Sequence, residues 1–111
     1  MSSITTHILD VSRGLPAEDV RVLLERETDS NWQTLMEIVT DSEGRARLFP
    51  EDEELTHGTY RLTFDVDAYF VAIEVTAFYP VVQIVFKVQD DRHHHVPLLL
   101  SPFGYSTYRG S

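Results

Sequence analysis

Three consecutive histidines, His93 to His95, run directly into the apolar segment Val96-Pro97-Leu98-Leu99-Leu100. In a β-strand, alternate side chains lie on the same face. His94 therefore shares a face with Leu98 and Leu100, which we expect to be the core face, and His95 points away from the core. A histidine outside the core is a candidate for proton transfer, because its ordinary pKa, about 6.5, lies near neutrality.

The chain ends in an aromatic and hydroxyl-rich tail that follows a Ser-Pro-Phe-Gly turn at residues 101–104. Strand alternation places Ser106 and Tyr108 on one face of this tail. If the segments on either side of the turn pair as a hairpin, His95 shares a surface with Ser106 and Tyr108. Chain ends usually fray, so a tail with this many polar groups is predicted to have a function.

A zinc site is an alternative interpretation of the histidines. His93 and His95 lie on one strand face at a spacing that suits two zinc ligands, and His7 could supply a third. No motif fixes that third ligand, and the chain has no cysteine. We therefore expect no metal site.

Two further candidate positions stand in ordinary strand patterns. His7 lies on a partly apolar strand face, and Arg45 shares a short strand face with Arg47. Buried polar groups normally find a hydrogen bond, and charged pairs on a strand usually face solvent. Pattern alone therefore favours a structural histidine and a solvated arginine pair.

Segments with strand-like alternation recur through the chain at intervals of about a dozen residues, with turn signals between them, which is typical of a β-sandwich. They lie at residues 4–11, 20–25, 32–40, 45–49, 60–64 and 81–88, followed by the terminal hairpin. In the turn at residues 41–44, Gly44 is expected to supply a positive backbone angle. Residues 67–77 fit both a helix and a strand.

Length and charge limit the function classes. The 111 residues predict a single domain, 1–111, with no room for an elaborate pocket, so a site built from two subunits is expected. The net charge of -9 argues against a nucleic acid or an anionic membrane surface as partner. No apolar run is long enough to span a bilayer, and only Met1-Ser2-Ser3 precede the first strand. We expect a cytoplasmic protein.

The ending His-x-His-Val-Pro-Leu-Leu-Leu-Ser-Pro, followed by Tyr-Ser-Thr-Tyr-Arg-Gly-Ser, resembles the 5-hydroxyisourate hydrolases, the transthyretin-related proteins of purine breakdown. Further matches lie, in the same order as in that family, at Thr6-His7-Ile8-Leu9-Asp10, Gly14-Leu15-Pro16-Ala17, Asp41-Ser42-Glu43-Gly44-Arg45, Gly58-Thr59-Tyr60 and Phe78-Tyr79-Pro80. The resemblance covers nearly the whole chain. The Tyr-Arg-Gly-Ser terminus is specific to the enzymes as opposed to the hormone carriers.

The resemblance implies an all-β, transthyretin-like β-sandwich of two mostly antiparallel sheets, with about eight strands and one short helix around residues 67–77. It implies metal-free hydrolysis, without a cofactor, that opens the six-membered ring of 5-hydroxyisourate by adding water across a C–N amide bond. The product is 2-oxo-4-hydroxy-4-carboxy-5-ureidoimidazoline.

The resemblance also implies a site and an assembly. His7, Arg45 and His95 would be catalytic, and the same three residues would bind substrate together with Ser106 and Tyr108. They would meet in the cleft between the two dimers of a homotetramer. The alternative is a transthyretin-like protein that carries a small ligand of the thyroid hormone type in this cleft. A purely structural β-sandwich, such as an adhesin, would leave the histidines and the tail without a function.

One residue departs from the family pattern. The family usually has a tyrosine between its two histidines, where this chain has His94. Because His94 faces opposite to His95, we expect a changed contact beneath the site and an intact catalytic face.

Overall fold

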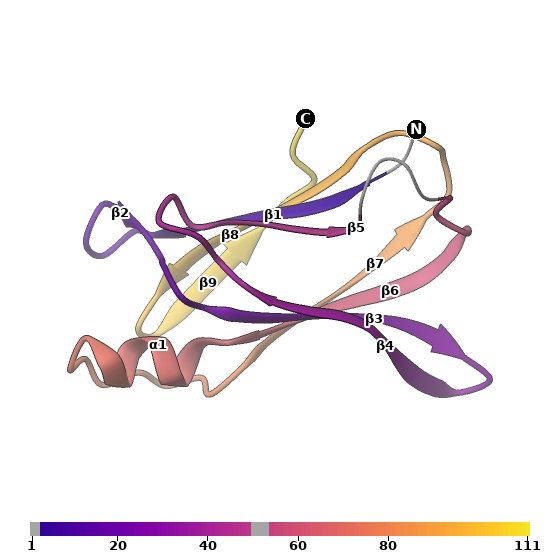
Figure 1. The fold of residues 1–111 in the computed structure, drawn as a ribbon. Coiled ribbons are helices and arrows are strands. Elements are labelled where there is room, and N and C mark those ends of the chain that lie inside the picture. Colours follow the sequence, from indigo (N-terminus) through magenta and orange to yellow (C-terminus); the bar gives the residue numbers. More distant parts are fainter. Residues whose placement is uncertain (1–2, 50–53) are drawn as a thin grey trace.

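The computed structural model describes residues 3–49 and 54–111, which form two β-sheets and one short helix (Figure 1). The strands are β1 (Ile4–Asp10), β2 (Leu15–Pro16), β3 (Arg21–Thr28), β4 (Asn31–Val39), β5 (Arg45–Phe49), β6 (Gly58–Asp65), β7 (Val82–Val88), β8 (His94–Ser101) and β9 (Gly104–Thr107), and the helix is α1 (Val66–Ala72). The predicted all-β sandwich is confirmed. The expected eight strands are joined by a ninth, the two-residue β2.

The first sheet joins the two ends of the chain. β1 pairs in parallel with β8, with Thr5 opposite His95. β9 pairs antiparallel with β8, with Ser106 opposite Leu99, so the predicted terminal hairpin is confirmed. On its other side β1 pairs antiparallel with β5 near its start and with β2 near its end. Strands from the beginning, middle and end of the sequence therefore lie in one sheet.

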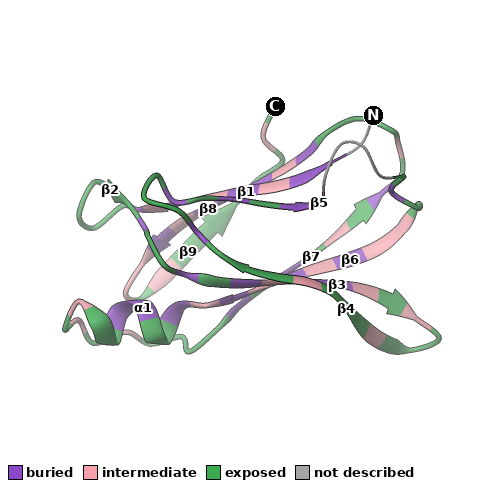
Figure 2. Cartoon of the chain, in the orientation of Figure 1, coloured by how far each residue is buried: buried purple, intermediate pink, exposed green. Residues whose placement is uncertain are grey.

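The second sheet is antiparallel throughout, in the order β4-β3-β6-β7. Together with the first sheet it encloses the core, and buried residues alternate with more exposed ones along β1, β5 and β6, whereas β4 has no buried residue (Figure 2). Ile8 and Leu98 from the first sheet, and Leu24 and Phe64 from the second, are fully buried. Burial of each such side chain stabilises the fold by about 1.5–3 kcal/mol relative to exposure.

The helix α1 begins directly after β6. The carboxylate of Asp65 accepts a hydrogen bond from the backbone N–H of Ala68, which caps the first turn. Val66, Tyr69 and Phe70 form its buried face. The short helix therefore contributes its buried face to the core.

The helix predicted over residues 67–77 is shorter than expected and ends at Ala72. Glu74 adopts a left-handed backbone conformation with a φ of 59°, which breaks the helical path. Ile73 and Ala77 still pack against the core from irregular backbone. Their spacing resembled a helical face because irregular backbone that packs against the core also carries apolar side chains on its inner side.

Within residues 3–49 and 54–111, no helix has both the length and the apolar character needed to cross a membrane.

Candidate active site

The outer face of the first sheet gathers three of the residues that the sequence singled out. In β1, His7 lies opposite Arg45 of β5 and opposite Pro97 of β8. Two positions away along β8, His95 lies opposite Thr5. Directly opposed residues in a sheet share a face, so His7, Arg45 and His95 all lie on the side away from the core. The predicted orientation of His95 is confirmed.

An open pocket of about 520 Å³ lies on this face. Its lining residues are Thr5, Thr6, Ile38, Val39, Asp41, Arg45, Ala46, Arg47, His93, His95 and the C-terminal Ser111. The pocket combines two guanidinium groups with two imidazoles and a carboxylate. It can therefore hold an anionic or strongly polar ring and move protons on it.

His95 is half-buried in this pocket. Its Nδ1 lies 2.8 Å from the Oγ1 of Thr5. Burial lowers the pKa of His95, and the nearby His93, Arg45 and His7 lower it further. At neutral pH the imidazole is therefore neutral, which is the form that can accept a proton from water.

The turn before β5 positions Arg45. The carboxylate of Asp41 accepts hydrogen bonds from the backbone N–H groups of Glu43 and Arg45, at 2.9 and 3.0 Å, and these bonds lower the pKa of Asp41. Gly44 has a φ of 74°, and a Cβ there would lie 2.5 Å from the carbonyl oxygen of Ile8. The predicted need for glycine is confirmed, and it includes close approach as well as backbone angle.

The two tail residues are less closely gathered than the histidines and Arg45. Ser106 lies opposite Leu99, hence on the outer face, but it does not line the pocket beside Arg45. Tyr108 is 59% exposed and lines a smaller, apolar pocket of about 130 Å³ with His95 and Phe86. One chain therefore brings His95 beside both Arg45 and Tyr108, but in two adjoining pockets.

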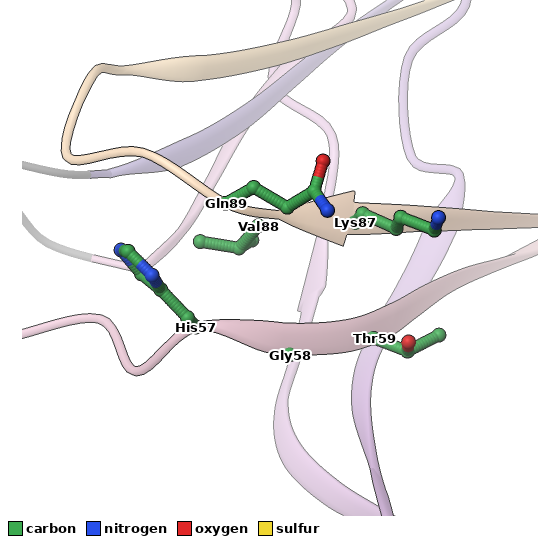
Figure 3. Close-up of a pocket in the computed structure, with 6 residues that line it drawn as sticks. All are labelled: His57, Gly58, Thr59, Lys87, Val88 and Gln89. Carbon is green, nitrogen blue, oxygen red and sulfur yellow. The ribbon is translucent and has the colours of Figure 1, made fainter.

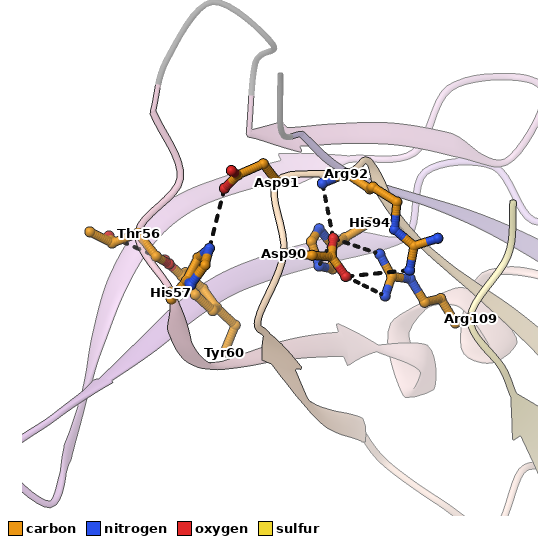
Figure 4. A network of polar contacts seen from close by, with 8 residues as sticks. All are labelled: Thr56, His57, Tyr60, Asp90, Asp91, Arg92, His94 and Arg109. Atoms are coloured by element: carbon orange, nitrogen blue, oxygen red, sulfur yellow. Dashed lines mark hydrogen bonds and ion pairs between the residues drawn. The ribbon is translucent and has the colours of Figure 1, made fainter.

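The tail is held in place by its last residues. The guanidinium of Arg109 donates hydrogen bonds to both carboxylate oxygens of Asp90, at 3.1 and 3.3 Å, and this pair lowers the pKa of Asp90 (Figure 4). The N–H of Gly110 donates to the carbonyl oxygen of His95 at 2.8 Å. A Cβ on Gly110 would lie 2.6 Å from the ring of His95. Arg109 and Gly110 thus tether the tail beside His95.

His94 lies beneath this tether on the core face. It is 2% exposed, and its Nε2 is 3.8 Å from the Asp90 carboxylate. Within the described residues neither ring nitrogen makes a hydrogen bond of normal geometry. Burial, then the charge of Arg109, lowers the pKa of His94, so the ring is neutral at pH 7.

Sequence reasoning did not assign Thr5, Asp41, Asp90 or Arg47 to the site. Each is an ordinary strand or turn residue in the sequence, and only the pairing of β1 with β5 and β8, or the course of the tail, gives it a place near His95. His93 was considered only as a metal ligand, although the alternation that places it beside His95 was visible. In the described part of the chain, no group of three or more His, Cys, Asp or Glu side chains is arranged to hold a metal ion.

A second open pocket, of about 530 Å³, lies at the far end of β6 and β7. It is lined by His57, Gly58, Thr59, Lys87, Val88 and Gln89 (Figure 3). The ring of His57 lies 3.2 Å from the carboxylate of Asp91. This pocket is as large as the one at His95 but contains no arginine and one imidazole, so it is the weaker candidate for chemistry.

Comparison with known proteins agrees with this geometry. Residues 4–110 match the HIUase/Transthyretin family. The chain belongs to this family. It is 48% identical over 116 residues to a 5-hydroxyisourate hydrolase of Caulobacter vibrioides, a match that covers 100% of both chains.

Two solved structures of the family define the choice of function. A 5-hydroxyisourate hydrolase of Klebsiella pneumoniae superposes with a TM-score of 0.87 at 41% identity, covering 98% of this chain and 99% of that one. Sea bream transthyretin in complex with thyroxine superposes with a TM-score of 0.90 at 33% identity, covering 96% and 93%. Fold similarity alone therefore does not separate the two functions, and the side chains of the site must.

Proposed function

We propose that this protein is a 5-hydroxyisourate hydrolase that opens the substrate ring to give 2-oxo-4-hydroxy-4-carboxy-5-ureidoimidazoline. The observation that carries the proposal is the neutral imidazole of His95 in one pocket with the guanidinium of Arg45. A base and a fixed cation at one opening are what hydrolysis of a polar cyclic amide requires. The full-length similarity to a Caulobacter vibrioides 5-hydroxyisourate hydrolase supports it.

In the proposed reaction, His95 takes a proton from a water molecule while the oxygen of that water attacks the carbonyl carbon of the ring amide. The C–N bond then breaks, and the leaving nitrogen receives the proton. Such acid-base catalysis contributes about 10²- to 10⁴-fold in rate. His7, which lies opposite Arg45, is the second imidazole available for proton return.

Arg45 has the binding role. Its planar guanidinium can donate two hydrogen bonds to the carbonyl oxygens of the ring and stabilise negative charge as water adds. The protein has a net charge of -9, so this local positive charge is needed to attract an anionic substrate. Ser106 and Tyr108 complete the proposed binding set, because their hydroxyl groups can donate hydrogen bonds to ring oxygens. The proposal includes no metal and no cofactor.

We also propose a homotetramer, built as a dimer of dimers, with the sites at the dimer-dimer interface. Within the described chain, β7 and β9 each pair on one side only, and unpaired edges favour association with another strand. The outer-face pocket is open, so a facing subunit would enclose the substrate and bring a second tail close to it. Sedimentation equilibrium tests the assembly: a stable monomer with full activity would contradict it.

A cytoplasmic location is part of the proposal, and cell fractionation tests it.

A carrier of thyroid hormone type is the alternative, favoured by the structural similarity to sea bream transthyretin in complex with thyroxine. The exposed ring of Tyr108 at the tail would narrow a channel for such a bulky ligand. Saturable thyroxine binding without hydrolysis would support the carrier.

The test of function is a decay assay. 5-Hydroxyisourate is generated from urate with uricase, and its ultraviolet absorbance is followed with and without the protein, in the presence and absence of a chelator. We expect the protein to accelerate decay equally in both conditions. Decay at the spontaneous rate would refute the hydrolase, and loss of activity with the chelator would refute the metal-free reaction.

A further inference from the structure

A continuous line of polar contacts joins the two imidazoles of the pocket, those of His95 and His93, to the start of the chain. The Nδ1 of His95 and the Nε2 of His93 each lie 2.8 Å from the same hydroxyl oxygen, Oγ1 of Thr5. The Nδ1 of His93 in turn contacts the Oγ of Ser3. The line thus runs His95, Thr5, His93, Ser3, and it alternates between the histidines at the start of β8 and the start of the chain.

The backbone fixes the geometry of this line. Thr5 lies opposite His95 in the parallel pair of β1 and β8, and the N–H of His94 donates to the carbonyl oxygen of Ser3 at 2.7 Å. The rings of His93 and His95 lie nearly parallel, with centroids 6.1 Å apart and planes at 18°. Thr5 therefore sits between two imidazoles that the sheet holds in register.

The chemistry of a hydroxyl makes this line directional. Thr5 has one proton, so it can donate to one imidazole nitrogen and must accept from the other. If His95 donates from Nδ1, Thr5 donates to Nε2 of His93, and His93 keeps its own proton on Nδ1. If the protons all shift by one bond, the direction reverses and His95 accepts at Nδ1 instead.

We propose that Thr5 and His93 are positioning residues that hold His95 with its proton on Nδ1 and so leave its Nε2 free to take a proton from water. When Nε2 takes that proton, the proton on Nδ1 of His95 moves to Thr5, and the proton of Thr5 moves to His93. The inference rests on the proposed hydrolase function. It assigns the base to Nε2 of His95 and gives both Thr5 and His93 a part in the reaction. Neither residue needs to touch the substrate.

The protons balance over one turnover. Water gives a proton to Nε2 of His95, the Nδ1 proton of His95 passes to Thr5, and the proton of Thr5 passes to Nε2 of His93. His95 is then neutral with its proton on Nε2, so in this route His95, rather than His7, donates to the nitrogen released when the C–N bond breaks. As His95 donates this proton, protons return from His93 through Thr5 to Nδ1 of His95, so the His95 ring stays neutral throughout.

The surroundings favour a positive charge on His93 over one on His95. Arg45, Arg47, Asp41 and the C-terminal Ser111 line the same pocket as His95, and the charges of Arg45 and of His7 in β1 act on the His95 ring. A positive charge on half-buried His95 is disfavoured by burial and by the nearby charge of Arg45. His93 is exposed, so water can stabilise its charge.

Kinetics of matched variants test the proton route. Thr5→Val removes the hydroxyl but keeps the branched shape, and Thr5→Ser keeps the hydroxyl. We expect Thr5→Val to lower kcat about 10- to 100-fold with KM within about twofold, and Thr5→Ser to stay within about threefold of wild type. Equal loss in both variants, or loss in neither, would overturn the proposal.

His93→Gln separates proton transfer from simple contact, because glutamine retains polar contacts but takes no proton. We expect kcat to fall as in Thr5→Val. The acid limb of the kcat/KM profile should move to higher pH, because the charge of His93 lowers the pKa of His95. In the double variant Thr5→Val/His93→Gln the loss should equal that of Thr5→Val alone, since the line is already broken. Additive losses would overturn the proposal.

A measurement without substrate separates this inference from the proposed function. Nitrogen-15 NMR of the imidazoles, above the ordinary histidine pKa of about 6.5, reports which ring nitrogen holds the proton. We expect Nδ1 for His95 in the wild type and loss of that preference in Thr5→Val. Active enzyme with His95 protonated on Nε2 would overturn the inference alone. An inactive wild type with the Nδ1 form would overturn the hydrolase and the role of the line in it, while supporting the tautomer.

Discussion

Each of the two sheets carries a cluster of polar side chains on its outer face. The two clusters differ in how many of their polar groups are hydrogen-bonded within the sheet. On the second sheet, Glu25 of β3 accepts two hydrogen bonds from the guanidinium of Arg61, at 2.9 and 2.7 Å, and a third from the hydroxyl of Thr63 at 2.8 Å. Arg61 also stacks on Trp32, with its guanidinium carbon 4.3 Å from the ring centroid. Both carboxylate oxygens of Glu25 therefore have hydrogen-bond partners within the sheet.

The cluster on the first sheet places an imidazole at an open pocket, where it can exchange a proton. His95 uses Nδ1 on Thr5, and its ring lies at an open pocket with Arg45. The pKa shifts differ in kind. The hydrogen bonds from Arg61 lower the pKa of Glu25 and stabilise its charged form, whereas burial lowers the pKa of His95 and stabilises its neutral form. The Glu25 carboxylate is therefore stabilised in its charged form by partners within its sheet, whereas the neutral His95 ring at an open pocket suits the role of base that we propose for it.

The largest expected effect is on activity at the first sheet. His95→Ala removes the proposed base, so we expect kcat in the decay assay to fall by about 10²- to 10⁴-fold. The free energy of unfolding, measured in urea, should change by less than about 1 kcal/mol, because the side chain is half-buried and outside the core. Activity within tenfold of wild type would remove His95 from the mechanism.

The mirror experiment is on the second sheet. Glu25→Gln removes a charged partner of Arg61, so we expect the free energy of unfolding to fall by about 2 kcal/mol, in the range for hydrogen bonds to charged groups. The rate of 5-hydroxyisourate decay should stay within twofold. A large loss of activity with unchanged stability would show that the two clusters are not separated in function.

The pH dependence of the free energy of unfolding gives a second test with the Glu25→Gln variant. Folding lowers the pKa of Glu25 from its ordinary value of 4.5, so its stabilising effect is complete above that pH and is lost as pH falls below it. The stability difference between wild type and Glu25→Gln should therefore shrink below pH 4.5, as urea titrations at several pH values would measure. A difference that is constant with pH would assign the effect to packing.

Alternation along single strands was enough to predict faces but not partners. It placed His95 outside and His94 with Leu98 inside, as the structure has them. It could not place Thr5 beside His95, because that contact depends on the parallel pairing of two segments 90 residues apart. The roles of His7, Arg45, Ser106 and Tyr108 came from the family resemblance and stay predictions.

The end of the helix shows the other limit. Glu74 takes a left-handed conformation that sequence patterns assign to glycine or asparagine, so nothing in residues 67–77 marked the stop at Ala72. The Asp90–Arg109 pair was hidden for a different reason. Both residues read as solvated charges, and only the return of the tail along β8 brings them together.

The smallest expected effect is at His94, which lies on the core face of β8, opposite to the face of His95. His94→Tyr restores the residue usual in the family, and because position 94 faces the core we expect kcat to stay within about tenfold, or about 1.4 kcal/mol. Since burial lowers the pKa of His94, wild type should lose stability as pH falls below the ordinary histidine value of 6.5, and the variant should lose less. Decay assays and urea unfolding between pH 5 and 8 measure both. A collapse of activity in His94→Tyr would show that this position acts on the pocket through His95 or the Asp90–Arg109 tether, and the separation of the two faces of β8 would then be wrong.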